Sequence, residues 1–171
     1  MASASAYVAL VAKVDAFVAR VTARHADDLR CAAGCASCCH ARLTITTVEA
    51  DAITAWAAQQ SVAQRAAIAA AAARTDHGDR CSALDADDRC RIYDARPLVC
   101  RSHGIPIRLH ERGLPIVTAC ALNFTARGPA AADPDCVLDQ TLVSTTLGVI
   151  DRAAGGGPDR RVDLAALLAD L

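Results

Sequence analysis

Cysteines are the residues of this chain best suited to chemistry, and four of the nine lie in the stretch CAAGCASCCH. Cys31, Cys35, Cys38 and Cys39 follow the spacing C-x3-C-x2-C-C. In a helical or turning segment, residues three or four positions apart share a face, so three of these thiols can converge. Gly34 permits a tight or left-handed turn just before Cys35. Converging thiolates bind soft or borderline metals, so the stretch predicts a zinc or iron–sulfur centre.

The adjacent pair Cys38 and Cys39 limits how that centre is built. Both thiols can bind one metal only if the backbone is contorted. They could instead point to two centres, or one of them could lie outside the ligand set. The sequence leaves these three arrangements open.

A second group of cysteines follows in CSALDADDRCRIYDARPLVCR. Cys81, Cys90 and Cys100 are separated by eight and nine residues, gaps too wide for a local metal knuckle but suitable for loops that return to a shared site. Cys120 follows an expected hairpin and could turn back to the same region. The alternatives are disulfides or inert buried thiols, but the odd count and the density of the first group favour metal. Cys136 lies apart, and we expect an ordinary core cysteine there.

Composition sets the class of protein around these cysteines. The 171 residues suit a single domain spanning 1–171, and 53% are hydrophobic, much of that alanine, while aromatic residues make up 3%. This favours helices packed through small side chains. A net charge of −1 argues against a nucleic-acid partner.

The N-terminal residues bear on location. They lack a basic leader region, and Lys13 and Asp15 interrupt the apolar run. The alanine-rich run 66–73 is too short to span a bilayer. We therefore expect a cytoplasmic protein without a membrane partner, in which disulfides are disfavoured.

Local patterns predict the elements that must position the cysteines. Apolar residues at helical spacing predict a helix over 6–29. Two capping boxes, Thr46 with Glu49 and Ser61 with Gln64, predict helices over 47–59 and 62–74. IPIRLH and LPIVT flank ERG and indicate a small hairpin, and further helices are expected over about 136–153 and in VDLAALLAD. The expected fold is mainly α, with irregular cysteine-rich loops and a short β-hairpin around a metal site.

Taken in order, these motifs resemble the cysteine-cluster family labelled zinc- or iron-chelating, also called YkgJ-like. Its name motif is CxxCxxCC, and here the first gap holds three residues. The second block of the family reads C-x-x-L-D, then C-x-I-Y, then R-P-x-x-C-R, each of which this chain repeats between Cys81 and Arg101. The resemblance covers residues 31–124, a cysteine-cluster region flanked by N- and C-terminal helices.

The resemblance implies metal chelation by eight cysteines: Cys31, Cys35, Cys38, Cys39, Cys81, Cys90, Cys100 and Cys120. Members are often labelled iron–sulfur proteins or oxidoreductases, but no single reaction carries over, and no catalytic residue can be named. The expected cofactor is an iron–sulfur cluster, most simply 4Fe-4S, with a redox or electron-transfer role and a possible redox partner protein. Zinc in a structural or metal-handling protein is the alternative, and an enzyme with an open iron or zinc site is the third hypothesis.

The histidines could bind metal or have simpler roles. His40 and His103 lie close to candidate ligands and could complete a site if one cysteine is not used. A hydrogen bond to backbone or solvent is the more common role for such a histidine, and we expect it here. His25, His77 and His110 sit in polar contexts and are expected to be solvated.

Charged and aromatic neighbours of the second block also have expected roles. Arg91, Arg96 and Arg101 are expected to offset the charge of a thiolate centre, with an anionic substrate as the alternative. Tyr93 is expected to pack with its hydroxyl hydrogen-bonded. The aspartates of the segment LDADD are expected to form a solvated turn because they lack calcium-loop spacing.

Overall fold

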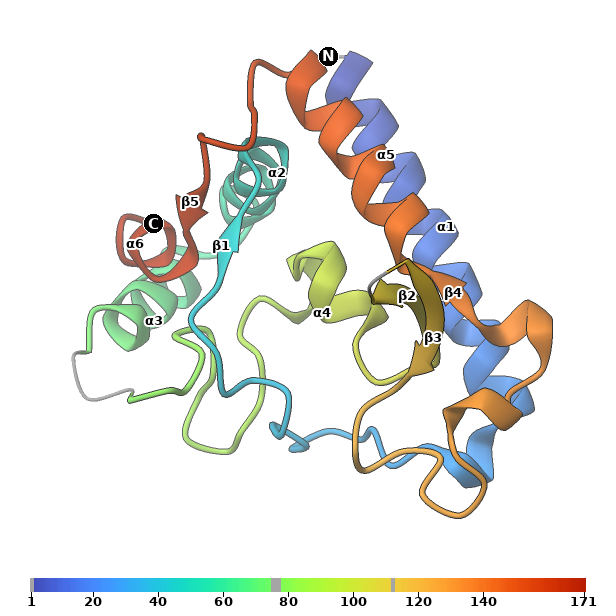
Figure 1. The fold of residues 1–171 in the computed structure, drawn as a ribbon. Coiled ribbons are helices and arrows are strands. Elements are labelled where there is room, and N and C mark those ends of the chain that lie inside the picture. The colour runs from blue at the N-terminus through green and yellow to red at the C-terminus, as the bar shows by residue number, and fades with distance from the viewer. Residues whose placement is uncertain (1, 75–77, 112) are drawn as a thin grey trace.

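The computed structural model describes residues 2–74, 78–111 and 113–171. Its helices are α1 (Ala2–Arg24), α2 (Thr47–Ala57), α3 (Val62–Ala72), α4 (Leu98–Ser102), α5 (Gln140–Ala153) and α6 (Leu164–Ala169). Its strands are β1 (Thr44–Ile45), β2 (Ile107–Glu111), β3 (Leu114–Thr118), β4 (Leu138–Asp139) and β5 (Val162–Asp163). The expected mainly α class with irregular loops and a hairpin is confirmed (Figure 1).

Both predicted capping boxes start their helices. The Thr46 hydroxyl accepts the Glu49 N–H, and Glu49 Oε2 accepts the Thr46 N–H at 3.0 Å. Ser61 and Gln64 make the same reciprocal pair at the start of α3. Each box satisfies two of the backbone donors that a helix N-terminus leaves without partners.

The expected hairpin is β2 paired antiparallel with β3, from Ile107 opposite Thr118 to Glu111 opposite Leu114. The two-residue strand β4 joins β2 in parallel, and β1 pairs antiparallel with β5 near the C-terminus. These short strands were not predicted, because two residues carry no periodicity to detect.

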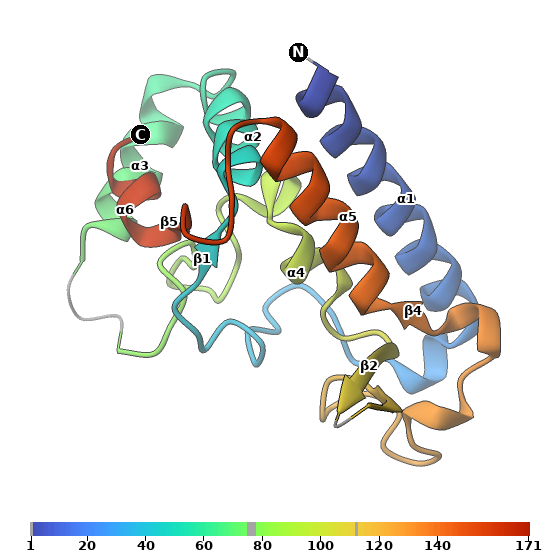
Figure 2. The same cartoon turned by 45° about the horizontal axis from the view of Figure 1, so that its top comes forward.

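Among the described residues, two clusters of buried apolar side chains form the core. The first gathers Tyr7, Val14 and Val21 of α1 with residues of α4 and α5. The second gathers residues of α2, α3, α6 and the cysteine loops, among them Ile53 and Leu168. α2 belongs to both, because its Val48 lies in the first cluster and its Ile53 in the second. The views show α1 beside α5 on one side, α3 beside α6 on the other, and irregular loops running between them (Figures 1 and 2).

Some helix boundaries differ from expectation, and one helix was not predicted. The first helix ends at Arg24 instead of residue 29, and α5 begins at Gln140, where Asp139 accepts the Leu142 N–H at 2.9 Å. Cys136 therefore does not open this helix but ends a 3-10 turn, Pro134–Cys136. Helix α4 was not predicted, because its five residues are too few to show a helical period.

Within the described residues, α1 is long and apolar enough to cross a membrane by length and composition. Core helices of soluble proteins and N-terminal signal sequences meet the same criterion. In the structure α1 packs against α2, α4 and α5 and buries Tyr7, Val14 and Val21.

Candidate metal centre

The first four cysteines lie in an irregular segment between α1 and β1, held by local turns. The Cys35 N–H donates to Ala32 O at 3.0 Å, and the Cys39 N–H donates to Ala36 O at 2.8 Å. Gly34 has φ +86°, the left-handed conformation expected from its place before Cys35. Cys31 and Cys38 are exposed, while Cys35 and Cys39 are half-buried.

Asn123 fastens this segment to two others. Its buried amide Nδ2 donates to Gly104 O at 2.7 Å and lies 3.3 Å from Cys31 Sγ, while its Oδ1 accepts the Arg30 N–H at 2.8 Å. At Gly104, with φ +101°, a Cβ would lie 2.8 Å from Cys31 Sγ, so only glycine lets the thiol approach the backbone. The sequence interpretation missed Asn123, whose one signal was its place three residues after Cys120.

The electrostatic neighbours of Cys31 define one set of thiols. Burial raises the pKa of Cys31, and the amide of Asn123 lowers it in part. The thiols of Cys120, Cys35 and Cys38 raise it further. We call these four residues, Cys31, Cys35, Cys38 and Cys120, the Cys31 set.

A second set surrounds Cys100. Burial raises the pKa of Cys100 to about 12, with further upward contributions from the thiols of Cys81, Cys90, Cys39 and Cys38. The pKa of Cys39 is also raised to about 12, first by burial and then by Cys38, Cys81 and Cys90. We call Cys39, Cys81, Cys90 and Cys100 the Cys100 set, and Cys38, assigned to the Cys31 set, is also a neighbour of this one. Each of the eight candidate cysteines thus acts on, or is acted on by, the charge of another of the eight. Cys136 is not among the thiols that act on Cys31, Cys39 or Cys100.

The two sets meet at the adjacent pair, where Cys38 Sγ lies 3.9 Å from Cys39 Sγ. Elsewhere the thiols are more widely spaced. Among residues 2–74, 78–111 and 113–171, no three of the eight candidate thiols have their sulfur atoms all within 4.8 Å of one another. A tetrahedral zinc ion with Zn–S bonds of about 2.3 Å needs S···S separations of about 3.8 Å.

A tight loop presents Cys81 and Cys90. An isolated antiparallel bridge joins Leu84 to Cys90, and the Cys81 N–H donates to Cys39 O at 2.7 Å, tying the loop to the first segment. The Asp85 carboxylate accepts the N–H groups of Asp87 and Arg89, both at 2.9 Å. The aspartates therefore form the expected turn.

Helix α4 presents Cys100, and a buried carboxylate from α2 holds its first turn. Glu49 Oε1 accepts the Leu98 N–H at 3.0 Å, and Glu49 is only 3% exposed. The Cys100 N–H donates to Pro97 O at 3.0 Å, which closes the turn that begins the helix. Glu49 was recognised only as part of a capping box, because a contact across 49 residues has no local signal.

The arginines of the second block differ in role. Arg96 lies near a thiol: burial raises the pKa of Cys90, and the positive charge of Arg96 opposes that shift. Arg101 does not fit the expected role of offsetting thiolate charge, because its guanidinium is buried against Asp15 Oδ2 at 2.7 Å and Arg96 O at 2.9 Å. Tyr93 was expected to pack but is 60% exposed, with the Arg96 guanidinium 3.9 Å from its ring centroid.

The histidines also differ in solvent exposure. His40 and His103 are exposed, and His110 is exposed as expected. His77 lies outside the described residues. The expectation that His25 is solvated was wrong: it is 6% exposed, at the end of α1. Its neighbours Arg24 and Asp27 are exposed, whereas its ring packs beside Phe124 and faces the half-buried Asp28.

The fold and the thiol arrangement define the class as a small, mainly helical cysteine-cluster domain. The family model named CxxCxxCC, described as "Putative zinc- or iron-chelating domain", matches residues 30–120, over half of the chain. The chain therefore belongs to this family, which confirms the resemblance and supports metal chelation. Neither the search of curated proteins nor that of solved structures gave a match.

Proposed function

We propose that this chain is an iron–sulfur protein that serves in electron transfer or redox chemistry. One observation carries the proposal: the eight cysteines come from three separate segments and act on one another electrostatically, with Cys38 a neighbour of both sets and its Sγ 3.9 Å from that of Cys39. Four cysteine thiolates are the ligand set of both 2Fe-2S and 4Fe-4S clusters. The ligands proposed for the centres are the eight members of the Cys31 and Cys100 sets.

The spacing of the thiols supports a polynuclear centre. In a 4Fe-4S cluster each thiolate binds a different iron, so the sulfur atoms stand further apart than around one ion. Among the described residues no three candidate thiols lie within 4.8 Å of one another, which supports the proposal, while the sulfur atoms of Cys38 and Cys39 lie 3.9 Å apart. A 4Fe-4S cluster would supply one-electron transfer, at a potential that depends on hydrogen bonds to sulfur and on solvent exposure.

The surroundings of the thiols suit a negatively charged centre. The Asn123 amide is aimed at Cys31 Sγ at 3.3 Å, and the positive charge of Arg96 acts on Cys90. Both contacts favour thiolate over thiol. The exposed Cys31 and Cys38 would place one side of the centre within reach of a redox partner protein.

A second candidate, a zinc protein without catalysis, also has an observation in its favour. The 3.9 Å between Cys38 Sγ and Cys39 Sγ matches the edge of about 3.8 Å in a zinc tetrathiolate. In that case the adjacent pair would bind one ion together.

The proposal further includes a cytoplasmic location, which is supported by the need for reduced thiols in either kind of centre.

The deciding experiment is metal and acid-labile sulfide analysis of full-length protein purified without air, with its visible spectrum. Iron with matching sulfide and a broad band near ~400 nm is expected from thiolate-to-iron charge transfer. The Cys136→Ala variant should keep this iron, because Cys136 belongs to neither set. Zinc without sulfide would favour the second candidate, and iron without sulfide would indicate an open-site enzyme. Protein without metal would overturn the proposal.

A further inference from the structure

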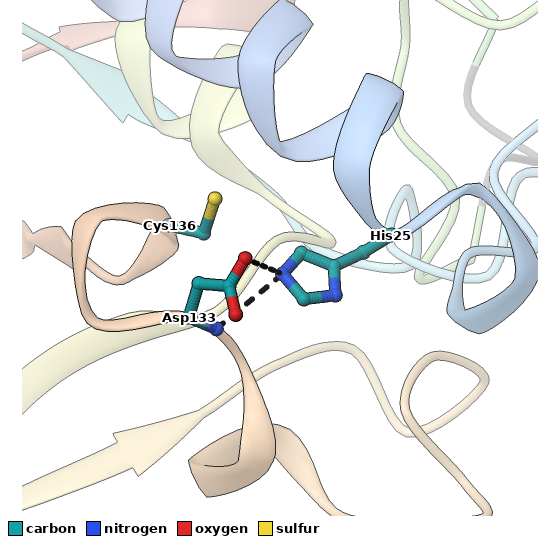
Figure 3. A group of neighbouring side chains, drawn as sticks. All are labelled: His25, Asp133 and Cys136. Atoms are coloured by element: carbon teal, nitrogen blue, oxygen red, sulfur yellow. Dashed lines mark hydrogen bonds and ion pairs between the residues drawn. The ribbon is translucent and has the colours of Figure 1, made fainter.

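We propose a second cation site, separate from the cysteine sets, formed by His25, Asp133 and Cys136 and suited to a divalent ion such as zinc (Figure 3). One ligand atom from each residue lies within 4.8 Å of the other two. Among the residues that the structure describes, this is the one such group of three metal-binding side chains.

The fold brings these residues together from distant segments. His25 follows the last turn of α1, where its N–H donates to Val21 O at 2.9 Å, and its ring lies 5.3 Å from that of Phe124. Asp133 precedes and Cys136 ends a 3-10 turn, which the Cys136 N–H closes by donating to Asp133 O at 2.8 Å. His25 is 6% exposed and Cys136 is fully buried, so two of the three groups are held in place by packing.

The donor set fits zinc. Imidazole nitrogen, carboxylate oxygen and thiolate sulfur are its three common protein donors, with bonds of about 2.0–2.3 Å. Tetrahedral geometry then needs donor separations of about 3.3–3.8 Å. His25 Nε2 lies 3.7 Å from Asp133 Oδ2. The Asp133 side chain is 55% exposed, so a fourth position can be filled by water, as in zinc sites with three protein ligands.

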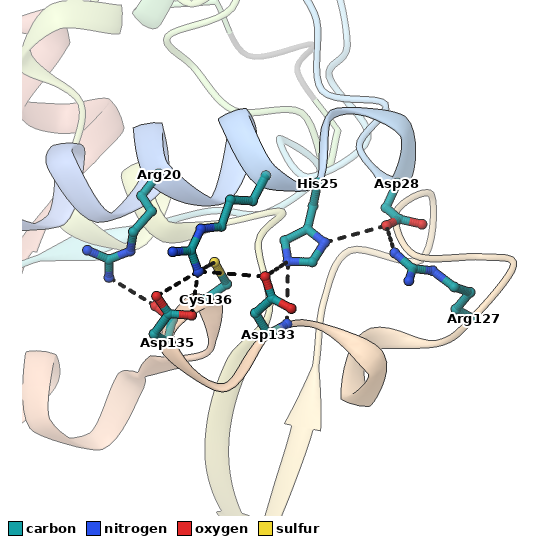
Figure 4. Close-up of polar contacts among 8 residues, drawn as sticks. Arg20, His25, Asp28, Arg127, Asp133, Asp135 and Cys136 are labelled. Carbon is teal, nitrogen blue, oxygen red and sulfur yellow. Dashed lines mark hydrogen bonds and ion pairs between the residues drawn. The ribbon is translucent and has the colours of Figure 1, made fainter.

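The histidine is oriented for this role. His25 Nε2 accepts the Asp133 backbone N–H at 3.4 Å, so its lone pair faces Asp133, and the bound ion would take over this lone pair from the N–H. Nδ1 then carries the hydrogen and faces Asp28 Oδ2 at 3.6 Å, and Asp28 is paired in turn with Arg127 (Figure 4). A carboxylate behind the remote nitrogen is the usual support of a metal-binding histidine.

Arg24 is the competing positive charge. Its Nη1 lies 2.7 Å from Asp135 Oδ1, 3.6 Å from Asp133 Oδ2 and 4.0 Å from Cys136 Sγ. The side chain of Arg24 is 47% exposed, so it can move toward solvent without opening the core. We expect the cation to replace Arg24 at Asp133 and Cys136, while Arg24 keeps its stronger contact with Asp135.

Zinc equivalents bound per chain test this site in the full-length protein after its cysteine sets have been loaded. We expect wild type to hold one more zinc ion than each of His25→Gln, Asp133→Asn and Cys136→Ala. His110→Gln, which changes an exposed histidine on β2, should match wild type. Asp28→Asn should weaken zinc binding at this site by roughly 10- to 100-fold through lost orientation of the ring. Arg24→Met should tighten it by about two- to fivefold, because an exposed competing charge is removed.

Two further measurements do not depend on variants that lose a ligand and fold poorly. Diffraction from wild-type crystals soaked in zinc should show an anomalous peak between the three ligand atoms at the zinc edge. Arg24→Met keeps all three ligands. If His25, Asp133 and Cys136 serve only in ion pairs and packing, this change should leave zinc binding unchanged or weaker instead of tighter. The site is overturned if wild type binds no zinc beyond its cysteine sets, if no anomalous peak lies there, or if Arg24→Met fails to tighten binding.

Discussion

At the scale of single residues, Asn123 joins three chain segments through one amide group. Its Oδ1 satisfies the Arg30 N–H, and its Nδ2 satisfies Gly104 O beside Cys31 Sγ. We expect Asn123→Leu to destabilise the protein by about 1–3 kcal/mol, because the buried Gly104 O and the partly buried Arg30 N–H lose their partner. Urea unfolding measures this, with exposed Thr125→Ala as the control from the same loop. A loss as small as that of the control would contradict the joining role.

The adjacent pair Cys38 and Cys39 decides whether the thiols hold one centre or two. If the Cys31 and Cys100 sets bind separately, Cys35→Ser and Cys100→Ser should each remove about half of the bound metal, and the double variant should remove all of it. One shared centre predicts that either single change removes nearly everything. Elemental analysis distinguishes the two results, and Ser37→Ala, an exposed change between Cys35 and Cys38, is the control from the same segment.

The protonation of buried thiols links metal binding to pH. Cys39 and Cys100 have pKa values of about 12 instead of the ordinary 9, first because burial disfavours the thiolate. The folded metal-free protein therefore holds protons that the unfolded chain releases, and its stability should fall as pH rises from about 9 toward 12.

Urea unfolding of metal-free protein between pH 7 and pH 10.5 measures this dependence. The midpoint should be level below pH 8 and should decline above about pH 9, where the unfolded thiols ionise. In Cys39→Ala/Cys100→Ala the decline should be smaller. An equal decline in the double variant would show that other groups cause it.

At the scale of elements, buried carboxylates of one helix hold the start of another. Glu49 of α2 accepts the first N–H of α4, and Asp151 of α5 accepts the Val48 N–H at the start of α2 at 3.0 Å. Both carboxylates are nearly inaccessible to solvent, at 3% and 2% exposed. The position of Cys100 therefore depends on a chain of helix contacts that runs from α5 through α2 to α4.

We expect Glu49→Ala to cost about 2–4 kcal/mol of stability, because the Leu98 and Thr46 N–H groups lose a charged acceptor inside the protein. The Cys100 thiol should also react faster with iodoacetamide as α4 loosens. Asp51→Asn, an exposed change on the same helix, is the control for stability and for reactivity. An unaltered Cys100 rate in a destabilised Glu49→Ala protein would show that α4 does not depend on this contact.

At the scale of the whole molecule, the helices carry most of the core and the cysteine loops carry little of it. The first apolar cluster draws mainly on α1, α4 and α5, and the second on α2, α3 and α6. Because metal-bound loops gain much of their order from the ligand bonds, removing the metal should release them before the helices.

Hydrogen exchange before and after chelation tests this prediction. Peptides from the cysteine loops within 31–124 should lose protection, while those from α1 and α5 should keep most of theirs. Unchanged exchange in the loops would mean that metal does not organise them. A loss of protection in every helix would mean that metal stabilises the whole fold.

Features set by neighbouring residues could be predicted from the sequence. Capping boxes, the hairpin and the left-handed turn at Gly34 depend on hydrogen bonds and backbone freedom within a few residues, so their signals are local. The sequence could also propose eight cysteines as ligands, because dense thiols and ordered motifs are visible in the chain itself, and that ligand set stays a prediction.

Only the tertiary structure decided how those residues are grouped. Whether Cys38 and Cys39 face one set or two depends on which loops return to them, and those loops come from segments tens of residues away. The same holds for the Glu49 contact with α4 and for buried His25 beside Asp133 and Cys136. Residue types determine which chemistry is available, whereas long-range packing determines which side chains share it, because burial and distance are set by the whole fold.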